Sequence, residues 1–111
     1  MYEKIGIICA ADSELAPFLP HIENIREHCS AMLKIYSGTL CGVPAAVLFS
    51  GVCRVNAAVA AQILICKFGA DAIINAGTAG AVSASLNIFD TVIATETAYH
   101  DVADNILTEF H

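Results

Sequence analysis

Short apolar runs separated by polar turns divide this chain into segments of strand and helix length. Residues 4–10, 33–40, 43–50 and 70–78 contain apolar and β-branched residues in runs of strand length, and each run predicts a strand. The first run is almost continuously apolar, as expected for a parallel strand that is covered on both faces. A further run rich in β-branched residues, 90–99, predicts one more strand.

Two helices are predicted between these strands. Asp12 or Ser13 is suited to cap a short helix, and Pro17 fits the first turn of that helix. A longer helix is expected over residues 55–68, where several alanines allow it to lie close to a sheet. Gly69 fits the position just past the end of this longer helix.

A polar, mixed segment covers residues 20–30 and is interpreted as the end of the first helix followed by a loop. It contains His21 and His28, which have no carboxylate or cysteine partner at convincing metal-ligand spacing. Both histidines are therefore assigned to the surface.

Two connections predict the topology of the sheet. The strands at 33–40 and 43–50 are separated by Cys41 and Gly42, a connection of hairpin length that predicts an antiparallel pair. Residues 43–78 form a strand-helix-strand pattern, whose crossover is expected to be right-handed and to place its two parallel strands side by side. We therefore predict an α/β fold with a mixed central sheet.

The composition is unusually apolar for a soluble protein of this size. The chain has 111 residues, of which 57% are hydrophobic and 14% are charged. We expect part of the apolar surface to face another chain, a ligand or a missing part of the same polypeptide. No uninterrupted apolar run approaches the roughly 18 residues that a membrane span needs, so no membrane association is expected.

Charge and cysteine content narrow the expected partners and location. The formal net charge is −6, and the five Lys and Arg residues are scattered along the chain. Binding a phosphate backbone requires clustered cations, so nucleic acid is not an expected partner. The five cysteines lack CxxC spacing and are interpreted as reduced core thiols of a cytosolic protein. With no signal segment before the first strand, a cytoplasmic location is expected.

Three turns at the ends of predicted strands carry the candidate chemistry, at residues 10–14, 50–54 and 76–80. In open α/β sheets, ligands bind outside the carboxyl ends of the strands. The carboxylate of Glu14, a helix N-terminus and the hydroxyl of Thr78 are therefore expected to converge on one crevice. None of the turns matches a P-loop or a GxGxxG motif, so a small ligand is favoured over a nucleoside triphosphate.

Simpler interpretations of these features stay open. Glu14 could be a first-turn acid that favours the helix dipole, and the glycine-rich turn around Thr78 could end a strand without binding anything. His100, Asp101 and Asp104 could be metal ligands, but one histidine and two nearby acids do not define a site. No metal or cofactor is expected.

Three stretches together resemble the nucleoside phosphorylase and nucleosidase superfamily, and most closely its bacterial 5'-methylthioadenosine/S-adenosylhomocysteine nucleosidases. They are residues 4–10 leading to Glu14, residues 50–58, and residues 73–80. Residues 99–101, at the end of the next predicted strand, are also similar. The resemblance implies a three-layer α/β/α fold of the nucleoside phosphorylase type.

The resemblance also implies a reaction, the hydrolysis of the N-glycosidic bond of an adenine thionucleoside to release adenine and a thioribose. Glu14 matches the acidic residue that binds and activates the attacking water, and Thr78 matches a serine or threonine beside that water. Val52 matches an apolar contact to the sugar, while Ala79 and Gly80 match backbone that lines the purine pocket. The implied partner is a small purine nucleoside.

Part of the family's machinery has no counterpart in this chain. Members of the family use a later Asp to protonate the purine and a Met-Glu pair to hold the ribose hydroxyls, all in the second half of the polypeptide. Residues 1–111 are therefore expected to be the N-terminal half of a single, apparently truncated domain that is catalytically incomplete alone. Association with the missing half, or the homodimer that is usual in the family, is expected.

Two alternatives to hydrolysis stay open. Arg54 raises the possibility of a purine nucleoside phosphorylase of the same fold, although a carboxylate at Glu14 would repel phosphate. The other alternative is a non-catalytic half-domain that binds a nucleoside or a partner without turnover. Cys53 and Arg54 replace the Gly-Lys that is usual in the family, and Ala11 stands where methionine is common.

Overall fold

The computed structural model describes residues 2–99, which fall into two compact units. The first unit ends at Ala79, and we call its described part, residues 2–79, the sheet unit. The second unit begins at Gly80 and is described here on its own terms up to residue 99.

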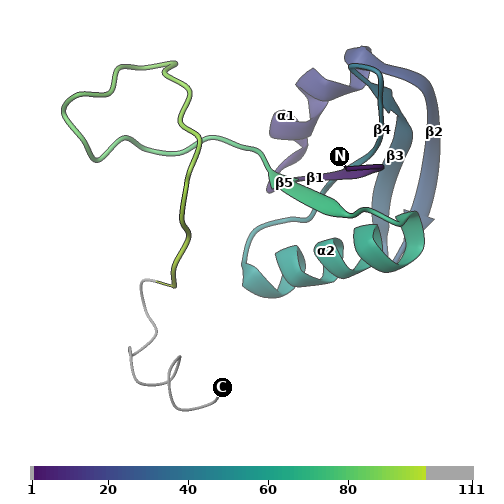
Figure 1. Ribbon diagram of the computed structural model, residues 1–111. Helices are drawn as coiled ribbons and strands as arrows, with labels where there is room; N and C mark the ends of the chain where they lie inside the picture. Colours follow the sequence, from purple (N-terminus) through teal and green to yellow (C-terminus); the bar gives the residue numbers. More distant parts are fainter. Residues whose placement is uncertain (1, 100–111) are drawn as a thin grey trace. The chain divides into compact units, whose positions relative to one another are not determined.

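The sheet unit contains five strands, two α-helices and a 3₁₀ helix (Figure 1). Their order along the chain is β1 (Ile5–Cys9), α1 (Asp12–Leu15), the 3₁₀ helix η1 (Ala16–His21), β2 (Ile22–Ser30), β3 (Leu33–Leu40), β4 (Val43–Phe49), α2 (Arg54–Phe68) and β5 (Ala72–Asn75). The strands form one sheet in the order β2-β3-β4-β1-β5.

The sheet is mixed, as predicted. Strand β1 runs parallel to both β4 and β5, while β3 is antiparallel to β2 and β4. The predicted hairpin is confirmed, because Cys41 and Gly42 connect β3 to β4 with φ values of +52° and +79°. The expectation that the β4-α2-β5 crossover places its two strands side by side is wrong. Strand β1 lies between them, so the first strand of the chain completes the parallel part of the sheet.

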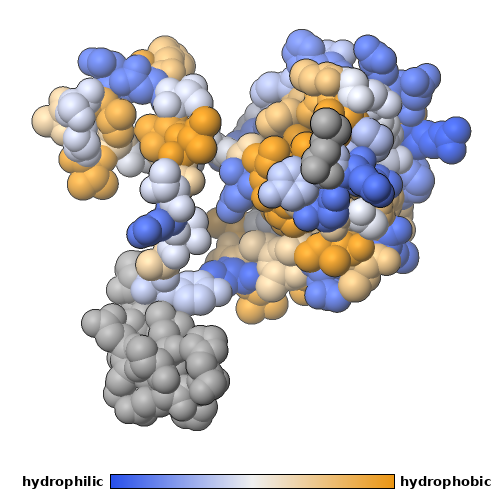
Figure 2. Space-filling model, in the orientation of Figure 1, coloured by the Kyte–Doolittle hydropathy of each residue, from blue (hydrophilic) through white to orange (hydrophobic). Residues whose placement is uncertain are grey.

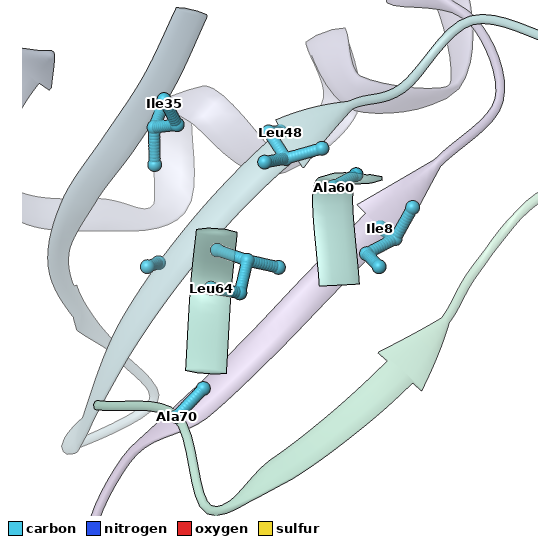
Figure 3. Close-up of a cluster of buried hydrophobic side chains, with 7 residues drawn as sticks. Ile8, Ile35, Leu48, Ala60, Leu64 and Ala70 are labelled. Carbon is cyan, nitrogen blue, oxygen red and sulfur yellow. The ribbon is translucent and has the colours of Figure 1, made fainter. Parts of the chain in front are cut away.

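Helices cover both faces of the sheet, which gives the expected three layers. In Figure 1, α1 and α2 lie on opposite sides of the strands. Alternate side chains of β1 accordingly enter different cores: Ile7 and Cys9 pack with Leu15 of α1, whereas Ile8 packs with Ala60 and Leu64 of α2 (Figure 3). The near-continuous apolar run of β1 therefore reflects burial on both faces.

Small residues let α2 approach the sheet closely. Ala60 is fully buried on the side that faces the strands, although Ala58 is exposed. At Gly6 of β1, an added Cβ would lie 3.0 Å from Cδ1 of Leu64. The helix ends as predicted at Gly69, whose φ of +68° is the left-handed conformation that favours glycine.

The interpretation of residues 20–30 as a helix end and loop is wrong. Residues 22–30 form β2, which pairs with β3 and is interrupted by an irregularity between Glu23 and Arg26. Because β2 is an edge strand, most of its side chains are exposed and its sequence lacks the apolar run of a buried strand. His21 and His28 are exposed, as predicted.

The strand predictions at 70–78 and 90–99 also need correction. The first is confirmed only for its central part, Ala72–Asn75. The second is wrong, because residues 90–99 have no regular secondary structure. A strand needs a partner for its backbone groups, and within the second unit, as far as it is described, no other strand supplies one. Val92 and Ile93 accordingly remain exposed.

Apolar surface is abundant, as the composition predicts. Figure 2 shows apolar side chains on the surfaces of both units. In β5, Ile73 and Ile74 are 37% and 47% exposed. Within residues 2–99, no helix is both long and apolar enough to cross a membrane. All five cysteines are free, as predicted, but only Cys9 is a buried core thiol, so the interpretation of the other four as core residues is wrong.

The core under α2 provides a test of the packing. Leu64 is fully buried in this core, whereas the adjacent Ile65 is 49% exposed. We expect Leu64→Ala to lower the free energy of unfolding by about 2–4 kcal/mol, because it removes buried methyl groups and leaves a cavity. Ile65→Ala should cost less than about 1 kcal/mol. Urea unfolding followed by circular dichroism measures both, and equal losses would contradict the placement of α2.

Candidate functional site

The carboxyl ends of the parallel strands β4, β1 and β5 are tied together by backbone hydrogen bonds. The amide of Ser50 donates to the carbonyl oxygen of Cys9 at 2.8 Å, and the amide of Ala76 donates to that of Ile8 at 2.9 Å. The turns that follow the three strands therefore start from one edge of the sheet, as predicted.

The carboxylate of Glu14 joins two of these turns. Its Oε1 accepts hydrogen bonds from the amide of Thr78 at 2.8 Å and from the hydroxyl of Thr78 at 2.9 Å. Its Oε2 accepts from the amides of Ala10 at 2.9 Å and Ala11 at 3.3 Å. Four donors from two segments of the chain thus converge on one carboxylate.

These contacts change the interpretation of α1. The residue that caps this helix is Ala11, not the predicted Asp12 or Ser13. A methyl group cannot accept a hydrogen bond, so the carboxylate of Glu14 takes a capping role through the amide of Ala11. A first-turn acid that only favoured the helix dipole would not need the bonds to Thr78, which lies 64 residues away in sequence.

The hydrogen bonds keep Glu14 ionised. They lower the pKa of its carboxyl group below the ordinary value of 4.5, with the amide of Thr78 as the largest cause and its hydroxyl as the next. The pKa of the Cys9 thiol is raised, mainly by burial and further by the negative charge of Glu14. At neutral pH this edge of the sheet therefore holds a carboxylate beside a neutral thiol.

Gly77 makes room for this carboxylate. A Cβ atom added there would lie 2.9 Å from Oε1 and 3.0 Å from Oε2 of Glu14. Within the described chain, the side chain of Glu14 is the group that occupies the space left by the missing side chain of Gly77. The neighbouring turn glycine, Gly80, has open space around an added Cβ.

A cleft of about 280 Å³ lies beside these turns. It is lined by the ends of β1, β4 and β5 and by the start of α2: Ile8, Ala10, Ser50, Gly51, Val52, Cys53, Arg54, Ala57 and Asn75. Ala10 contributes to both features, because it lines the cleft and its amide binds Glu14. A cleft of this size at a strand-to-helix junction is suited to a small molecule.

Side chains fix the turn between β4 and α2. The hydroxyl of Ser50 donates to the carbonyl oxygen of Gly51 at 2.7 Å, and Nδ2 of Asn56 donates to that of Val52 at 2.7 Å. Cys53 adopts a φ of +84°, a conformation that favours glycine. This geometry gives a physical reason why glycine is the usual residue at this position in the family that the sequence resembles.

The five predicted site residues are placed as follows. Glu14 and Thr78 are hydrogen-bonded, and Val52 lines the cleft with its side chain 74% exposed. Ala79 is exposed at the end of the first unit, and Gly80 belongs to the second. The roles of all five stay predictions.

The sequence did not reveal the backbone donors at Ala10 and Ala11. Main-chain amides carry no sequence signature, and the small size of these residues is the signal that remains. No group of three or more His, Cys, Asp or Glu residues suited to a metal ion occurs among residues 2–99. The possible ligands His100, Asp101 and Asp104 lie outside the described residues.

Comparison with known proteins identifies the family. The sequence model described as "Phosphorylase superfamily" matches residues 4–110, almost the whole chain. The chain belongs to the phosphorylase superfamily. This membership agrees with the mixed sheet and with helices on both faces.

Within the superfamily, the chain is similar to proteins named 5'-methylthioadenosine/S-adenosylhomocysteine nucleosidase. It is 44% identical over 99 residues to one from Anoxybacillus flavithermus, a match that covers 89% of this chain and 43% of the relative. It is 40% identical over 97 residues to one from Staphylococcus carnosus, covering 87% and 42%.

Solved structures agree with this similarity. A nucleosidase of this name from Colwellia psychrerythraea, in complex with adenine, has a TM-score of 0.88 and 34% identity, covering 96% of this chain and 44% of that one. One from Streptococcus pneumoniae with the transition-state inhibitor MT-ImmA has a TM-score of 0.88 and 38% identity, covering 94% and 45%. The chain thus spans less than half the length of these superfamily members and corresponds to their N-terminal part.

The close contact between Gly77 and the Glu14 carboxylate can be tested by adding a side chain at position 77. We expect Gly77→Ala to preserve the fold, because the Glu14 side chain can move away, but to weaken the hydrogen bonds from Thr78. Faster hydrogen exchange of the Thr78 amide, measured by nuclear magnetic resonance, should report the loss, with a change of about tenfold. Gly80→Ala is the matched control. Unchanged protection in Gly77→Ala would contradict the described contact.

The lowered pKa of Glu14 predicts a pH dependence of stability. A carboxyl group with a folded-state pKa below its unfolded value contributes full stabilisation above the unfolded pKa, which is 4.5 for Glu14, and loses it as the pH falls through the folded pKa. The urea midpoint should therefore fall on acidification below this value, and less steeply in Glu14→Gln. Asp71, whose pKa is lowered by the amides of Glu3 and Lys4, should leave a residual dependence in that variant.

The matched control for this experiment is Glu23→Gln, which removes an exposed carboxylate from β2. This variant should show the same dependence as the parent chain. Identical pH profiles for the parent chain and Glu14→Gln would show that the hydrogen bonds to this carboxylate do not stabilise the fold.

Proposed function

We propose that this chain provides part of the active site of a nucleosidase that hydrolyses the N-glycosidic bond of 5'-methylthioadenosine and S-adenosylhomocysteine. The products are adenine and the corresponding thioribose. The observation that carries the proposal is the side chain of Glu14, in α1 just beyond the end of β1, which accepts hydrogen bonds from Thr78 and from two backbone amides. The names of the similar proteins and the ligands in the two nucleosidase structures support the substrate class.

In the proposed mechanism, Glu14 orients the attacking water and accepts its proton. Cleavage of a ribosyl bond passes through a state with oxocarbenium character, and a nearby carboxylate stabilises the positive charge of the sugar. A lowered pKa suits this electrostatic role, because the carboxylate is charged while the positive charge develops on the sugar and becomes neutral only when it accepts the proton of the water. Thr78 fixes the carboxylate and lies beside the water.

The remaining predicted residues hold the substrate. Val52 contacts the sugar region from the cleft at the start of α2. The backbone of Ala79 and Gly80 lines the purine pocket. No cofactor takes part, because the reaction needs only water, a carboxylate and an acid that protonates the leaving base.

Water is favoured over phosphate as the nucleophile. The negative charge of Glu14 repels a phosphate dianion, and its position suits a neutral water. One observation favours the alternative of phosphorolysis by a purine nucleoside phosphorylase, namely that Arg54 lines the cleft. The two reactions can be distinguished by measuring whether release of the base depends on phosphate.

The proposed activity needs the rest of the fold. Residues 1–111 would form the N-terminal half of a single domain, as the coverage of less than half of each nucleosidase suggests. Among the described residues, β5 pairs on one side only, with β1, and leaves Ile73 and Ile74 partly exposed. We propose that the remaining strands continue the sheet from β5 and supply the acid that protonates the purine. A cytoplasmic homodimer is the proposed state of the complete enzyme.

The test measures adenine release from methylthioadenosine, with and without phosphate. It uses the completed protein, by which we mean this chain together with the rest of the proposed domain. We expect release without phosphate, and a loss of at least about 100-fold in kcat for Glu14→Gln. Adenine affinity should change by less than about threefold, because the substitution preserves the size of the side chain. The Glu23→Gln control should retain full activity.

Three results would oppose the proposal. Normal turnover in Glu14→Gln would remove Glu14 from the mechanism. Base release that requires phosphate would favour the phosphorylase. Adenine binding without turnover in the completed protein would favour a non-catalytic binding module.

A further inference from the structure

Three cations that are far apart in the sequence line two adjoining clefts of the sheet unit. The larger cleft has a volume of about 400 Å³ and is lined by Lys4, His28, Cys29, Ser30, Ser37, Lys67 and Phe68. The second, of about 270 Å³, is lined by Lys4, Asn24, Arg26, Ser37, Gly38, Thr39, Pro44 and Ala45. Both include Lys4 and Ser37, so we treat them together as the basic cleft. It gathers three of the five Lys and Arg residues of a chain with a net charge of −6.

Hydrogen bonds and ring contacts hold the polar groups of the basic cleft in place. Nζ of Lys67 donates to the hydroxyl of Ser30 at 2.9 Å, and Nε2 of His28 is 2.8 Å from the hydroxyl of Ser37. The ring of Phe68 contacts His28 edge-on, with centroids 5.1 Å apart. Nζ of Lys4 lies 5.8 Å from the centroid of the same ring. Lys4, His28 and Lys67 thus each contact another residue that lines the cleft.

No carboxylate side chain lines the basic cleft together with these cations. None of the residues that line either part is an Asp or a Glu. Asp71 lies close to Lys4, but its carboxylate accepts hydrogen bonds from the backbone amides of Glu3 and Lys4. Glu27 forms an ion pair with Lys34, which lines neither part. The residues that line the basic cleft thus include three cations and no carboxylate.

The basic cleft is separate from the Glu14 site. Lys67 and Phe68 are at the C-terminal end of α2, whereas Arg54 and Ala57 line the other cleft at the N-terminal end. A helix of 15 residues places these ends about 22 Å apart. A ligand of the basic cleft would not compete for space with a ligand beside Glu14.

We propose that the basic cleft binds the phosphate group of a small molecule. Ammonium groups and a guanidinium group are the usual protein donors to phosphate, and hydroxyls and an imidazole add further donors. Nucleic acid is disfavoured, because a phosphate backbone needs a longer track of cations than three side chains in an acidic chain. The ligand is either inorganic phosphate or a small phosphate monoester whose organic part fills the rest of the cleft.

The experiment titrates the 111-residue chain with inorganic phosphate and, separately, with glycerol 3-phosphate at constant ionic strength. Amide shifts in heteronuclear resonance spectra report binding. We expect saturable shifts centred on His28, Ser37 and Phe68. The double variant Lys4→Gln/Lys67→Gln should weaken the affinity by about tenfold or more, because two charge-assisted contacts are lost. Tighter binding of glycerol 3-phosphate than of phosphate identifies a monoester as the ligand, and the reverse order identifies the free ion.

Lys34→Gln is the matched control, since it removes one charge outside the basic cleft. It should leave the affinity within about twofold of the parent value, because Lys34 lines neither part of the cleft and its exposed charge is paired with Glu27. Circular dichroism confirms that each variant is folded. Linear, unsaturated shifts in the parent chain, or equal weakening by Lys34→Gln and the double variant, would overturn the proposal. Either result would leave the proposed nucleosidase untouched, because Glu14 takes no part in this test.

Discussion

The carboxylate of Glu14 is the contact on which the arrangement of the candidate site depends. It connects the turn after β1 to the turn after β5 through two hydrogen bonds from Thr78, and it also completes the first turn of α1. Gly77 must lack a side chain for the carboxylate to reach Thr78. A single acidic side chain thus has a structural role and the proposed catalytic role, and both depend on its negative charge.

The sheet places this carboxylate by bringing distant segments together. Strand β1 lies between β4 and β5, so the first residues of the chain form the centre of the parallel part of the sheet. Burial on both faces fixes the register of β1, because Ile7 and Ile8 enter two different cores. The position of Glu14 relative to Thr78 therefore rests on packing under α1 and α2 and on the strand pairing between them.

The parts of the fold with strong local signals could be predicted from the sequence. Strands β1 and β4 are apolar runs, Cys41 and Gly42 mark the turn between β3 and β4, and α2 ends at Gly69 as the pattern indicates. Strand β2 could not be recognised, because an edge strand with exposed side chains has no apolar periodicity. The position of β1 between β4 and β5 was missed for a different reason: a crossover pattern predicts parallel strands but not which strand inserts between them.

The site was predicted in part for similar reasons. Glu14 and Thr78 are polar side chains in small-residue turns, and such residues stand out in a sequence. The amides of Ala10 and Ala11 are backbone groups and do not. The proximity of Lys4, Arg26 and Lys67 could not be predicted from the sequence either. These residues are scattered along the chain, and only the fold brings them together.

Hydrogen bonds from Thr78, Ala10 and Ala11 hold Glu14 as a carboxylate at the edge of the sheet. The most direct measurement is the pKa of the Glu14 side chain in the folded chain, from the carboxyl ¹³C chemical shift as a function of pH. We expect a pKa below the ordinary value of 4.5, and a smaller lowering of the pKa in Thr78→Val, which lacks the hydroxyl donor. A pKa at or above the ordinary value in the parent chain would be inconsistent with these four hydrogen bonds, because the donors would then not stabilise an ionised group.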